Sequence, residues 1–317
     1  MRVADGAQNA SLAPTRRRNK RVDGGRKKLY NIGTKIKRGT IQMENNNKIT
    51  YADGTILVFD TETIGLQKSF CYDLGYIIIN PADGKILLRR ESIIEQIWNN
   101  RPLFDTAYYA AKRPIYTSRL KGRKAELMKW GYAMTRLIHD IKNFNVKSAY
   151  AFNSPFDDRV IDFNADYFHT RNGFDTIEIY DIRGYAIKFL ADENYKKYCR
   201  DHRDVKSADG TDKFFTENGN YASTAESFYC YLHGADGAPL NEEHTALTDS
   251  EWEAAILLEC LKRGATLETA YAVPKIIPTE ELKTLRIVGT DGEELFSTKY
   301  SSKRETKSAD GRIIKIK

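Results

Sequence analysis

The chain runs Phe59-Asp60-Thr61-Glu62-Thr63-Ile64-Gly65-Leu66 at the end of its first strongly apolar segment, Thr55–Phe59. That segment is short and rich in β-branched residues, which predicts a buried β-strand. Side chains two positions apart on a strand point the same way, so we expect Asp60 and Glu62 to project together. Two adjacent carboxylates repel unless cations lie between them, and Mg²⁺ or Mn²⁺ prefers such hard oxygen ligands. The alternative is a strand that ends in a polar turn, with both acids merely solvated.

A second acidic group follows a later apolar run, Ser148–Phe152. The sequence Asn153-Ser154-Pro155-Phe156-Asp157 then places capping residues and a proline where a helix would begin. Asp157 is therefore expected near the N-terminus of a helix at the edge of the sheet. The helix dipole alone also favours an acid in a first turn. Its position therefore does not distinguish a metal ligand from a helix cap.

A third pair, His244 and Asp249, lies at the start of the amphipathic run that contains Trp252, Ile256 and Cys260. Residues five apart in a continuous helix are about 140° apart around the axis. If the two side chains converge, His244 must lie in the loop or first turn before the helix. A histidine there is usually structural, but hydrolysis by a metal-bound water requires a general base that titrates near neutral pH.

The order and context of these groups resemble the three motifs of the DEDDh 3′-5′ exonucleases. These motifs are F-D-x-E-T-x-G-L at a strand end, N-x-x-F-D after a later strand and H-x-A-x-x-D before a final helix. This ribonuclease-H-like group includes the proofreading subunits of bacterial DNA polymerases, ribonuclease T and the oligoribonucleases. The resemblance spans about residues 55–263. It implies hydrolysis of phosphodiester bonds from a 3′ end with two divalent cations, Mg²⁺ or Mn²⁺.

Carried over to this sequence, the resemblance assigns roles to individual residues. Four carboxylates would bind the metal ions and one histidine would act as general base: Asp60, Glu62, Asp157, Asp249 and His244. Five positions would contact the 3′-terminal nucleotide, the last two more weakly: Thr61, Thr63, Leu66, Asn153 and Phe156. Asp158 and Asp162 would be bystanders, because the motif specifies the Asp directly after Phe156.

Patterns along the chain favour an α/β fold, and the resemblance implies a ribonuclease-H-like mixed β-sheet flanked by helices. Apolar runs at residues 55–59, 74–79 and 85–88 predict a strand followed by a hairpin. The segment 203–224 is polar and is expected to be a loop. A small hairpin is expected at 285–297, with room for another strand in the last seven residues. Two mainly helical stretches are expected at about 92–112 and 123–143. Helices are expected at about 154–163, 184–200, 224–233 and 247–263, with strands at 148–152 and 176–182.

The formal net charge of +7 is unevenly distributed. Residues 1–50 carry +10, residues 51–274 carry −6 and residues 275–317 carry +3. We expect a flexible basic arm at 1–50, an exonuclease domain at 51–274 and a C-terminal extension at 275–317. The arm either attracts the phosphates of a nucleic acid or is a solvated tail without a partner. The acidic domain suits carboxylates whose charge is offset by metal ions.

The sequence contains no run of about 18 apolar residues and no signal-peptide pattern near its beginning. We therefore expect a soluble, cytoplasmic protein with no membrane partner. A hydrophobic content of 41% is enough for a sizeable core, which excludes disorder throughout the chain.

Two Cys-x-x-His pairs, Cys199 with His202 and Cys230 with His233, offer a competing metal site. Four nitrogen and sulfur ligands would suit structural Zn²⁺. Both pairs fall within expected amphipathic helices, where cysteine is often a plain core residue. The spacing of these residues is the only observation that supports a zinc site.

These patterns predict an enzyme that removes 5′-mononucleotides from the 3′ end of single-stranded or frayed DNA. It would act as a free-standing nuclease or as a proofreading subunit that partners a DNA polymerase or replication complex. The motifs do not contact the sugar selectively, so a 3′-5′ exoribonuclease of the same fold is an alternative. An alternative of a different class is a non-catalytic nucleic-acid-binding protein that uses the basic arm.

Overall fold

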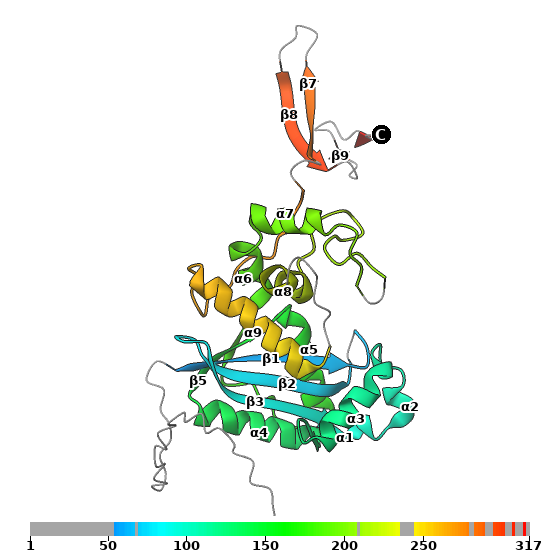
Figure 1. Ribbon diagram of the computed structural model, residues 1–317, viewed down its shortest axis with the longest axis vertical. Coiled ribbons are helices and arrows are strands. Elements are labelled where there is room, and N and C mark those ends of the chain that lie inside the picture. Colours follow the sequence, from blue (N-terminus) through cyan, green and yellow to red (C-terminus); the bar gives the residue numbers. More distant parts are fainter. Residues whose placement is uncertain are drawn as a thin grey trace, which may run out of the picture. The chain divides into compact units, whose positions relative to one another are not determined.

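The structure is a computed structural model that describes residues 54–66, 69–207, 210–234 and 244–278, and beyond them the backbone of four strands (Figure 1). The arm expected at residues 1–50 lies outside the described residues. The strands are β1 (Thr55–Thr63), β2 (Cys71–Asn80), β3 (Lys85–Ile94), β4 (Glu126–Met128), β5 (Val146–Ala151), β6 (Glu178–Asp181), β7 (Leu282–Val288), β8 (Glu294–Ser301), β9 (Thr306–Lys307) and β10 (Ile313–Ile314). The helices are α1 (Glu95–Trp98), α2 (Arg101–Phe104), the 3-10 helix η1 (Ala110–Lys112), α3 (Arg113–Lys121), α4 (Trp130–Asn143), α5 (Ser154–Tyr167), α6 (Ile182–Phe189), α7 (Glu193–Asp201), α8 (Ala225–His233) and α9 (Ala246–Lys262).

Six strands form one sheet in the order β4-β3-β2-β1-β5-β6. β2 runs antiparallel to both β1 and β3, whereas β5 is parallel to β1 and to β6, and β4 is parallel to β3. The expected mixed β-sheet flanked by helices is therefore confirmed (Figure 1). Among the described residues, no helix is both long and apolar enough to cross a membrane.

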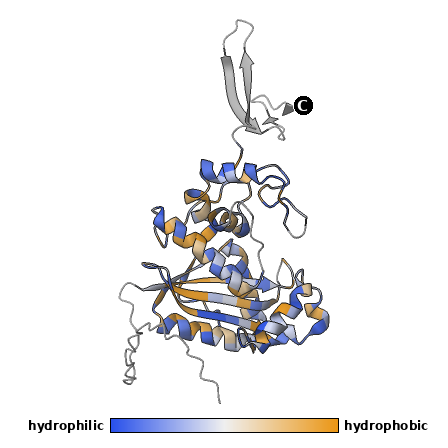
Figure 2. Ribbon diagram, in the orientation of Figure 1, coloured by the Kyte–Doolittle hydropathy of each residue, from blue (hydrophilic) through white to orange (hydrophobic). Residues whose placement is uncertain are grey.

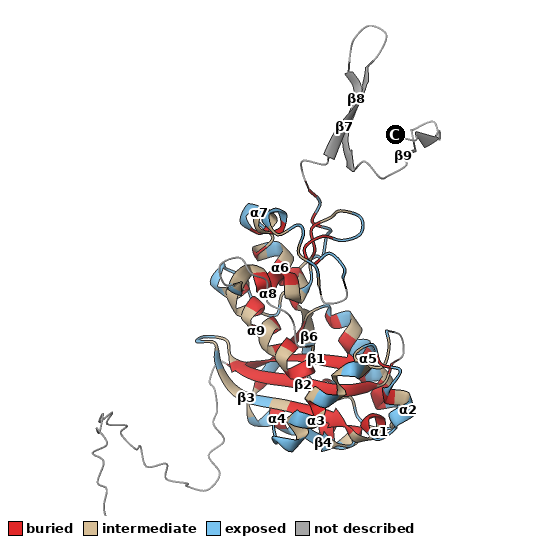
Figure 3. Cartoon of the chain, turned by 45° about the vertical axis from the view of Figure 1, so that its right-hand side comes forward, coloured by how far each residue is buried: buried red, intermediate tan, exposed pale blue. Residues whose placement is uncertain are grey.

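β1 is buried on both faces because helices cover each side of it (Figure 3). Ile56 and Val58 pack in the core cluster that includes residues of α6, α8 and α9. Leu57 and Phe59 pack in the other cluster, with residues of α4 and α5. Figure 2 shows the apolar residues that run along the central strands. By the alternation of a strand, Asp60 then lies on the α9 face and Thr61 on the α5 face.

The stretch 92–112, expected to be mainly helical, begins as a strand and continues as several short elements. β3 continues to pair with β2 as far as Ile93, opposite Asp73, so the first three residues of that range are strand. Two short helices and a 3-10 turn follow, and prolines sit in the first turns of α2 and α3. A proline lacks the amide hydrogen that a helix interior needs, so each one begins a new helix.

Two further expected helices are interrupted. Residues 126–128 form β4 at the sheet edge, and α4 begins only at Trp130. The expected helix at 184–200 is two helices, because Asp192 caps α7 by accepting a hydrogen bond from the amide of Tyr195. The C-terminal hairpin is confirmed: β7 pairs with β8 in antiparallel register, and β10 within the last seven residues pairs with β9.

The first turn of α9 rests directly on the backbone of β2. A Cβ atom added to Gly75 would lie 2.1 Å from the carbonyl carbon of Ala246 and from the amide nitrogen of Leu247. The hydroxyl of Ser250 donates a hydrogen bond to the Gly75 carbonyl at 3.2 Å. Gly75 is also the β2 neighbour of Asp60. The missing side chain therefore lets the start of α9 lie next to Asp60.

We expect Gly75→Ala to lower the free energy of unfolding by about 3 kcal/mol, the upper end of typical overpacking costs, because the new methyl meets backbone that cannot rotate away. Urea denaturation measures the change. Gly131→Ala in α4 is the matched control, since the nearest atom there is the Thr170 side-chain methyl at 3.2 Å. Alanine is the better helix former, so this control should change stability by less than about 1 kcal/mol. Equal costs for the two variants would contradict this account of the α9 contact.

Candidate metal centre

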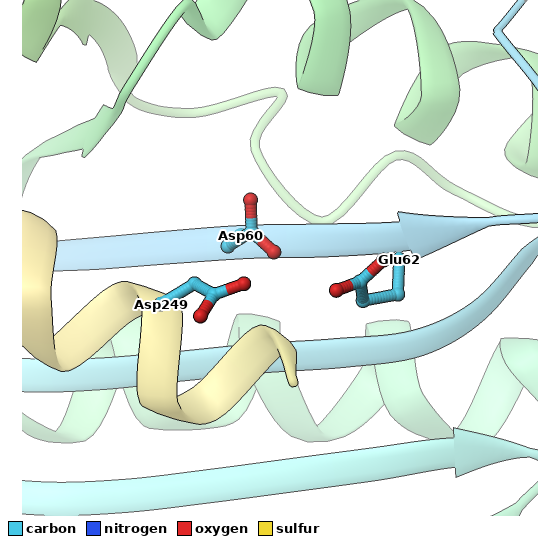
Figure 4. A group of neighbouring side chains, drawn as sticks. All are labelled: Asp60, Glu62 and Asp249. Carbon is cyan, nitrogen blue, oxygen red and sulfur yellow. The ribbon is translucent and has the colours of Figure 1, made fainter. Parts of the chain in front are cut away.

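Three carboxylates converge where β1 meets the first turn of α9. Asp60 and Glu62 project from β1, and Asp249 faces them from α9 (Figure 4). One oxygen from each side chain lies within 4.8 Å of the other two. Within the part of the chain that the structure describes, this is the group of side chains that could hold a metal ion. The period of the strand places Asp60 and Glu62 together, and the approach of α9 at Gly75 brings in Asp249.

Asp157 reaches the other face of the same strand. It lies in the first turn of α5, which follows β5 through Asn153, a residue in the left-handed region (φ 64°). Its Oδ1 accepts hydrogen bonds from the Thr61 hydroxyl at 2.7 Å and from the Thr61 amide at 3.2 Å. Asp157 is therefore adjacent to the three-carboxylate group, but it is held by Thr61 instead of sharing the 4.8 Å contact.

Burial raises the proton affinity of two of these acids, Asp60 and Asp157. Burial, followed by the negative charge of Asp157, raises the pKa of Asp60 well above its ordinary value. Burial also raises the pKa of Asp157, and the two bonds from Thr61 oppose that rise. A divalent cation would favour the charged form of every carboxylate around it. The donor set, made of carboxylate oxygens of the half-buried Asp60 and of the buried Glu62, Asp157 and Asp249, fits a hard cation such as Mg²⁺ or Mn²⁺.

His244 lies in the loop immediately before α9, the position that convergence with Asp249 would require, but its side chain is not part of the three-carboxylate group. Its backbone is in the left-handed region (φ 51°), and its carbonyl accepts a hydrogen bond from the Tyr116 hydroxyl at 3.3 Å. Its ring stacks on Tyr109, with centroids 4.6 Å apart and planes 15° apart. The ring therefore has one face covered, and it lies at the rim of a cleft of about 1090 Å³.

Asp73 anchors the start of α9, and no motif pointed to it. Its Oδ2 accepts a hydrogen bond from the amide of Ala246, the first residue of the helix, at 3.0 Å. The helix cap Thr245 makes no side-chain capping bond. Asp73 therefore satisfies one of the exposed amides of the helix and complements its positive end. It is the β2 neighbour of Glu62, so strand pairing could have revealed it.

Two more carboxylates hold the turn between β5 and α5. The amide of Phe152 donates to Oε2 of Glu253 at 3.1 Å, and the amide of Asn153 donates to Oδ1 of Asp181 at 2.8 Å. Glu253 is nearly fully buried and lies one helical turn after Asp249 on α9. That spacing of four residues is the signal that sequence reasoning could have used. Through Glu253, α9 is tied to the turn that positions Asp157.

The expected substrate contacts differ in accessibility. Leu66 is 83% exposed at the end of the first motif, and Asn153 is also exposed. Thr63 donates its hydroxyl to the carbonyl of Gly65 at 2.6 Å, which closes the loop after β1. Phe156 instead packs against the core, and Thr61 is buried against Asp157. Leu66 and Asn153 are thus the positions most open to a ligand.

The structure does not support the zinc alternative. The side chains of Cys199, His202, Cys230 and His233 do not form a metal-binding group among the described residues. Both cysteines are fully buried in the core, and burial raises the pKa of the Cys199 thiol to about 12. The ring of His202 packs on Tyr198 and that of His233 on Tyr229. On each helix, the cysteine faces the core while the histidine packs beside a tyrosine.

Comparison with known proteins shows a likeness only at the level of solved structures. No family model matches the sequence, and no curated protein matches it. Structures similar to this one include E. coli exonuclease I with a dA16 oligonucleotide (TM-score 0.39, 13% identity, 65% of this chain and 41% of that one). Others are the nuclease domain of 3′hExo, a DEDDh family member, bound to rAMP (0.43, 13%, 67% and 93%) and a full-length 3′-exonuclease (0.45, 12%, 73% and 92%). The chain thus spans about two fifths of the length of exonuclease I.

We expect Thr61→Val to weaken the hold on Asp157 while keeping the shape of the side chain. Losing a hydrogen bond to a charged group costs about 1.5–3 kcal/mol, so the free energy of unfolding at pH 8 should fall by that amount. Binding of Mn²⁺, measured by calorimetry, should also weaken. Thr61→Ser keeps the hydroxyl and serves as the control. If Val and Ser behaved alike, the bond to Asp157 would have no role in placing it.

Metal-free stability should fall as the pH rises. Because the folded-state pKa of Asp60 is raised, the folded protein holds a proton that the unfolded chain has already lost. The stability contributed by this group is complete below the ordinary Asp pKa, and it is lost as the pH rises through the folded value.

Melting temperatures at pH 5 and pH 8, with a chelator and with Mg²⁺, test this relation. Wild type with chelator should melt lower at pH 8, and Mg²⁺ should restore part of the difference. Asp60→Asn should melt higher than wild type at pH 8 with chelator and should gain less from Mg²⁺. A variant that melted lower than wild type in chelator would contradict the predicted repulsion among the carboxylates.

Proposed function

We propose that the chain is a metal-dependent 3′-5′ exonuclease that releases 5′-mononucleotides from the end of single-stranded or frayed DNA. The observation that carries this proposal is the convergence of Asp60, Glu62 and Asp249. Buried carboxylates at this density are unfavourable unless a cation offsets them, and phosphodiester hydrolysis is a reaction that such cations assist. Asp157 and His244 supply the remaining groups that the motifs predict.

Asp60, Glu62, Asp157 and Asp249 would hold the metal ions, with Mg²⁺ or Mn²⁺ as the preferred species. Two bound cations would supply an activated water and neutralise the charge that develops on the scissile phosphate. Thr61 orients Asp157 through its hydroxyl and its amide. Asp73 and Glu253 hold the backbone on which Asp249 and Asp157 depend.

His244 would accept the proton of the attacking water at one of its imidazole nitrogens. Stacking on Tyr109 limits rotation of the ring, and the bond from Tyr116 restrains the backbone behind it. A base that is already oriented loses less freedom when the reaction occurs. The exposed Leu66, the last residue of the first motif, would contact the terminal nucleotide.

DNA is the substrate that we favour over RNA. Proofreading in DNA replication would further require a polymerase partner that recruits this chain. Parallel assays on 5′-labelled single-stranded DNA, on duplex DNA with a paired or mismatched 3′ end, and on RNA of the same sequence separate these substrates. Preference for RNA would reassign the substrate and leave the reaction unchanged.

His244→Ala should lower the rate of degradation by about 10²–10⁴-fold, the usual contribution of a positioned acid–base group. Asp60→Asn should also lower the rate strongly, because it removes a carboxylate ligand of the metal ions that assist the reaction. The assay follows shortening of 5′-labelled single-stranded DNA in Mg²⁺ or Mn²⁺. Asp158→Asn is the matched control, because it changes an exposed acid beside Asp157 and should keep the wild-type rate. Wild-type rates in both site variants would show that the proposed function is wrong.

A further inference from the structure

The cleft beside His244 is larger than the terminal nucleotide requires. Its lining includes His244 and Asn153 at the candidate site, residues of the segment before α3, and residues of 206–207 and 210–226. Its volume of about 1090 Å³ exceeds the roughly 300–1,000 Å³ of most pockets for small ligands. A cleft of this size that reaches His244, the proposed general base, suits several linked nucleotides.

Aromatic rings form the edge of this cleft next to the site. Tyr108 is 72% exposed and lies edge-on to Tyr109, with centroids 4.8 Å apart. Tyr109 in turn stacks on His244. An exposed aromatic ring is the feature on which an unpaired base stacks, and such stacking accepts every base. The three rings therefore form a continuous surface from His244 outward.

Cationic side chains accompany the rings. Lys112 places its Nζ 4.3 Å from the centre of the Tyr109 ring. Across the cleft, Arg183 donates to the hydroxyl of Ser223 at 2.8 Å and 3.2 Å. Arg183 lies at the N-terminal end of α6, where the helix dipole disfavours a positive charge. A phosphate bound beside it would offset that cost.

Four of the charged side chains that residues 206–207 and 210–226 contribute to the cleft lining form ion pairs with one another. Lys213 is buried and makes an ion pair with Glu226 at 2.6 Å, and Lys206 pairs with Asp212. Two isolated bridges, Lys206 with Asp212 and Phe215 with Tyr221, brace this segment. Its charges therefore largely cancel. Lys112 and Arg183 are further cations in the lining of the cleft.

We propose, on the basis of the exonuclease function above, that this cleft binds the unpaired nucleotides that precede the terminal one. A base would stack on Tyr108, while Lys112 and Arg183 would contact the phosphates on either side of it. Paired bases cannot offer their faces to Tyr108. The cleft thus selects a single strand, whereas the carboxylates act on whichever 3′ end reaches them.

The test compares a dinucleotide with an octanucleotide of the same 3′ sequence. Tyr108→Ala should lower kcat/KM for the octanucleotide by about tenfold, the loss expected for one stacked base, and should affect the dinucleotide much less. Tyr132→Ala on α4 is the matched control, because Tyr132 is equally exposed (70%) but lies outside the cleft lining. Lys112→Gln should weaken octanucleotide binding and reduce its dependence on salt.

Binding of a fluorescent octanucleotide in the presence of a chelator, followed by anisotropy, makes the two proposals separable. A weaker Kd for Tyr108→Ala than for Tyr132→Ala supports the cleft even if no cleavage is seen, and absent cleavage by wild type would overturn the exonuclease function alone. Equal losses on the dinucleotide and the octanucleotide, or no loss on either, would overturn the cleft proposal. Near-wild-type melting temperatures exclude misfolding as the cause of any loss.

Discussion

The contact between the start of α9 and the bare backbone of β2 is the constraint on which the candidate site depends. Gly75 leaves no side chain between the two elements, Asp73 accepts the first amide of the helix, and Ser250 bonds to the Gly75 carbonyl. Asp60 and Glu62 are the strand neighbours of Gly75 and Asp73 on β1. A shift of α9 by the width of one methyl group would therefore separate Asp249 from both acids of β1. The same shift would move His244, which directly precedes the helix.

Asp73, which takes part in this contact, belongs to a set of buried charges on neighbouring strands. Asp73 is buried beside Glu91, and burial with that neighbouring charge raises the pKa of Asp73. Arg119 pairs with Glu91 at 2.7 Å and offsets part of this negative charge. Buried charges of this kind lower the stability of the fold, and a cation bound among the neighbouring carboxylates Asp60, Glu62 and Asp249 would offset part of that cost. The hydrophobic clusters on the two faces of the sheet supply the stability that this arrangement requires.

The two faces of β1 contribute different residues to the site. Asp60 and Glu62 face α9, whereas Thr61 faces α5 and holds Asp157 by two hydrogen bonds. Glu253 connects these halves, since it lies on α9 and binds the turn that leads into α5. One helix thus governs the positions of Asp249 and His244 directly and that of Asp157 indirectly. Tyr109, in the lining of the cleft, contacts the site by stacking on the ring of His244.

The mixed α/β sheet and the shared direction of Asp60 and Glu62 followed from the sequence, because strand periodicity is a local property of consecutive residues. The position of His244 before α9 followed from helical geometry in the same way. Local patterns could not place the break after β3, the pairing of Asp73 with α9 or the bond from Phe152 to Glu253. Local patterns also could not show that the two Cys-x-x-His pairs do not converge on a metal site. Cys199 and Cys230 face the core, whereas His202 and His233 pack beside tyrosines. Each of these depends on which distant segments meet, and tertiary packing decided them because burial and hydrogen bonding act across the whole chain.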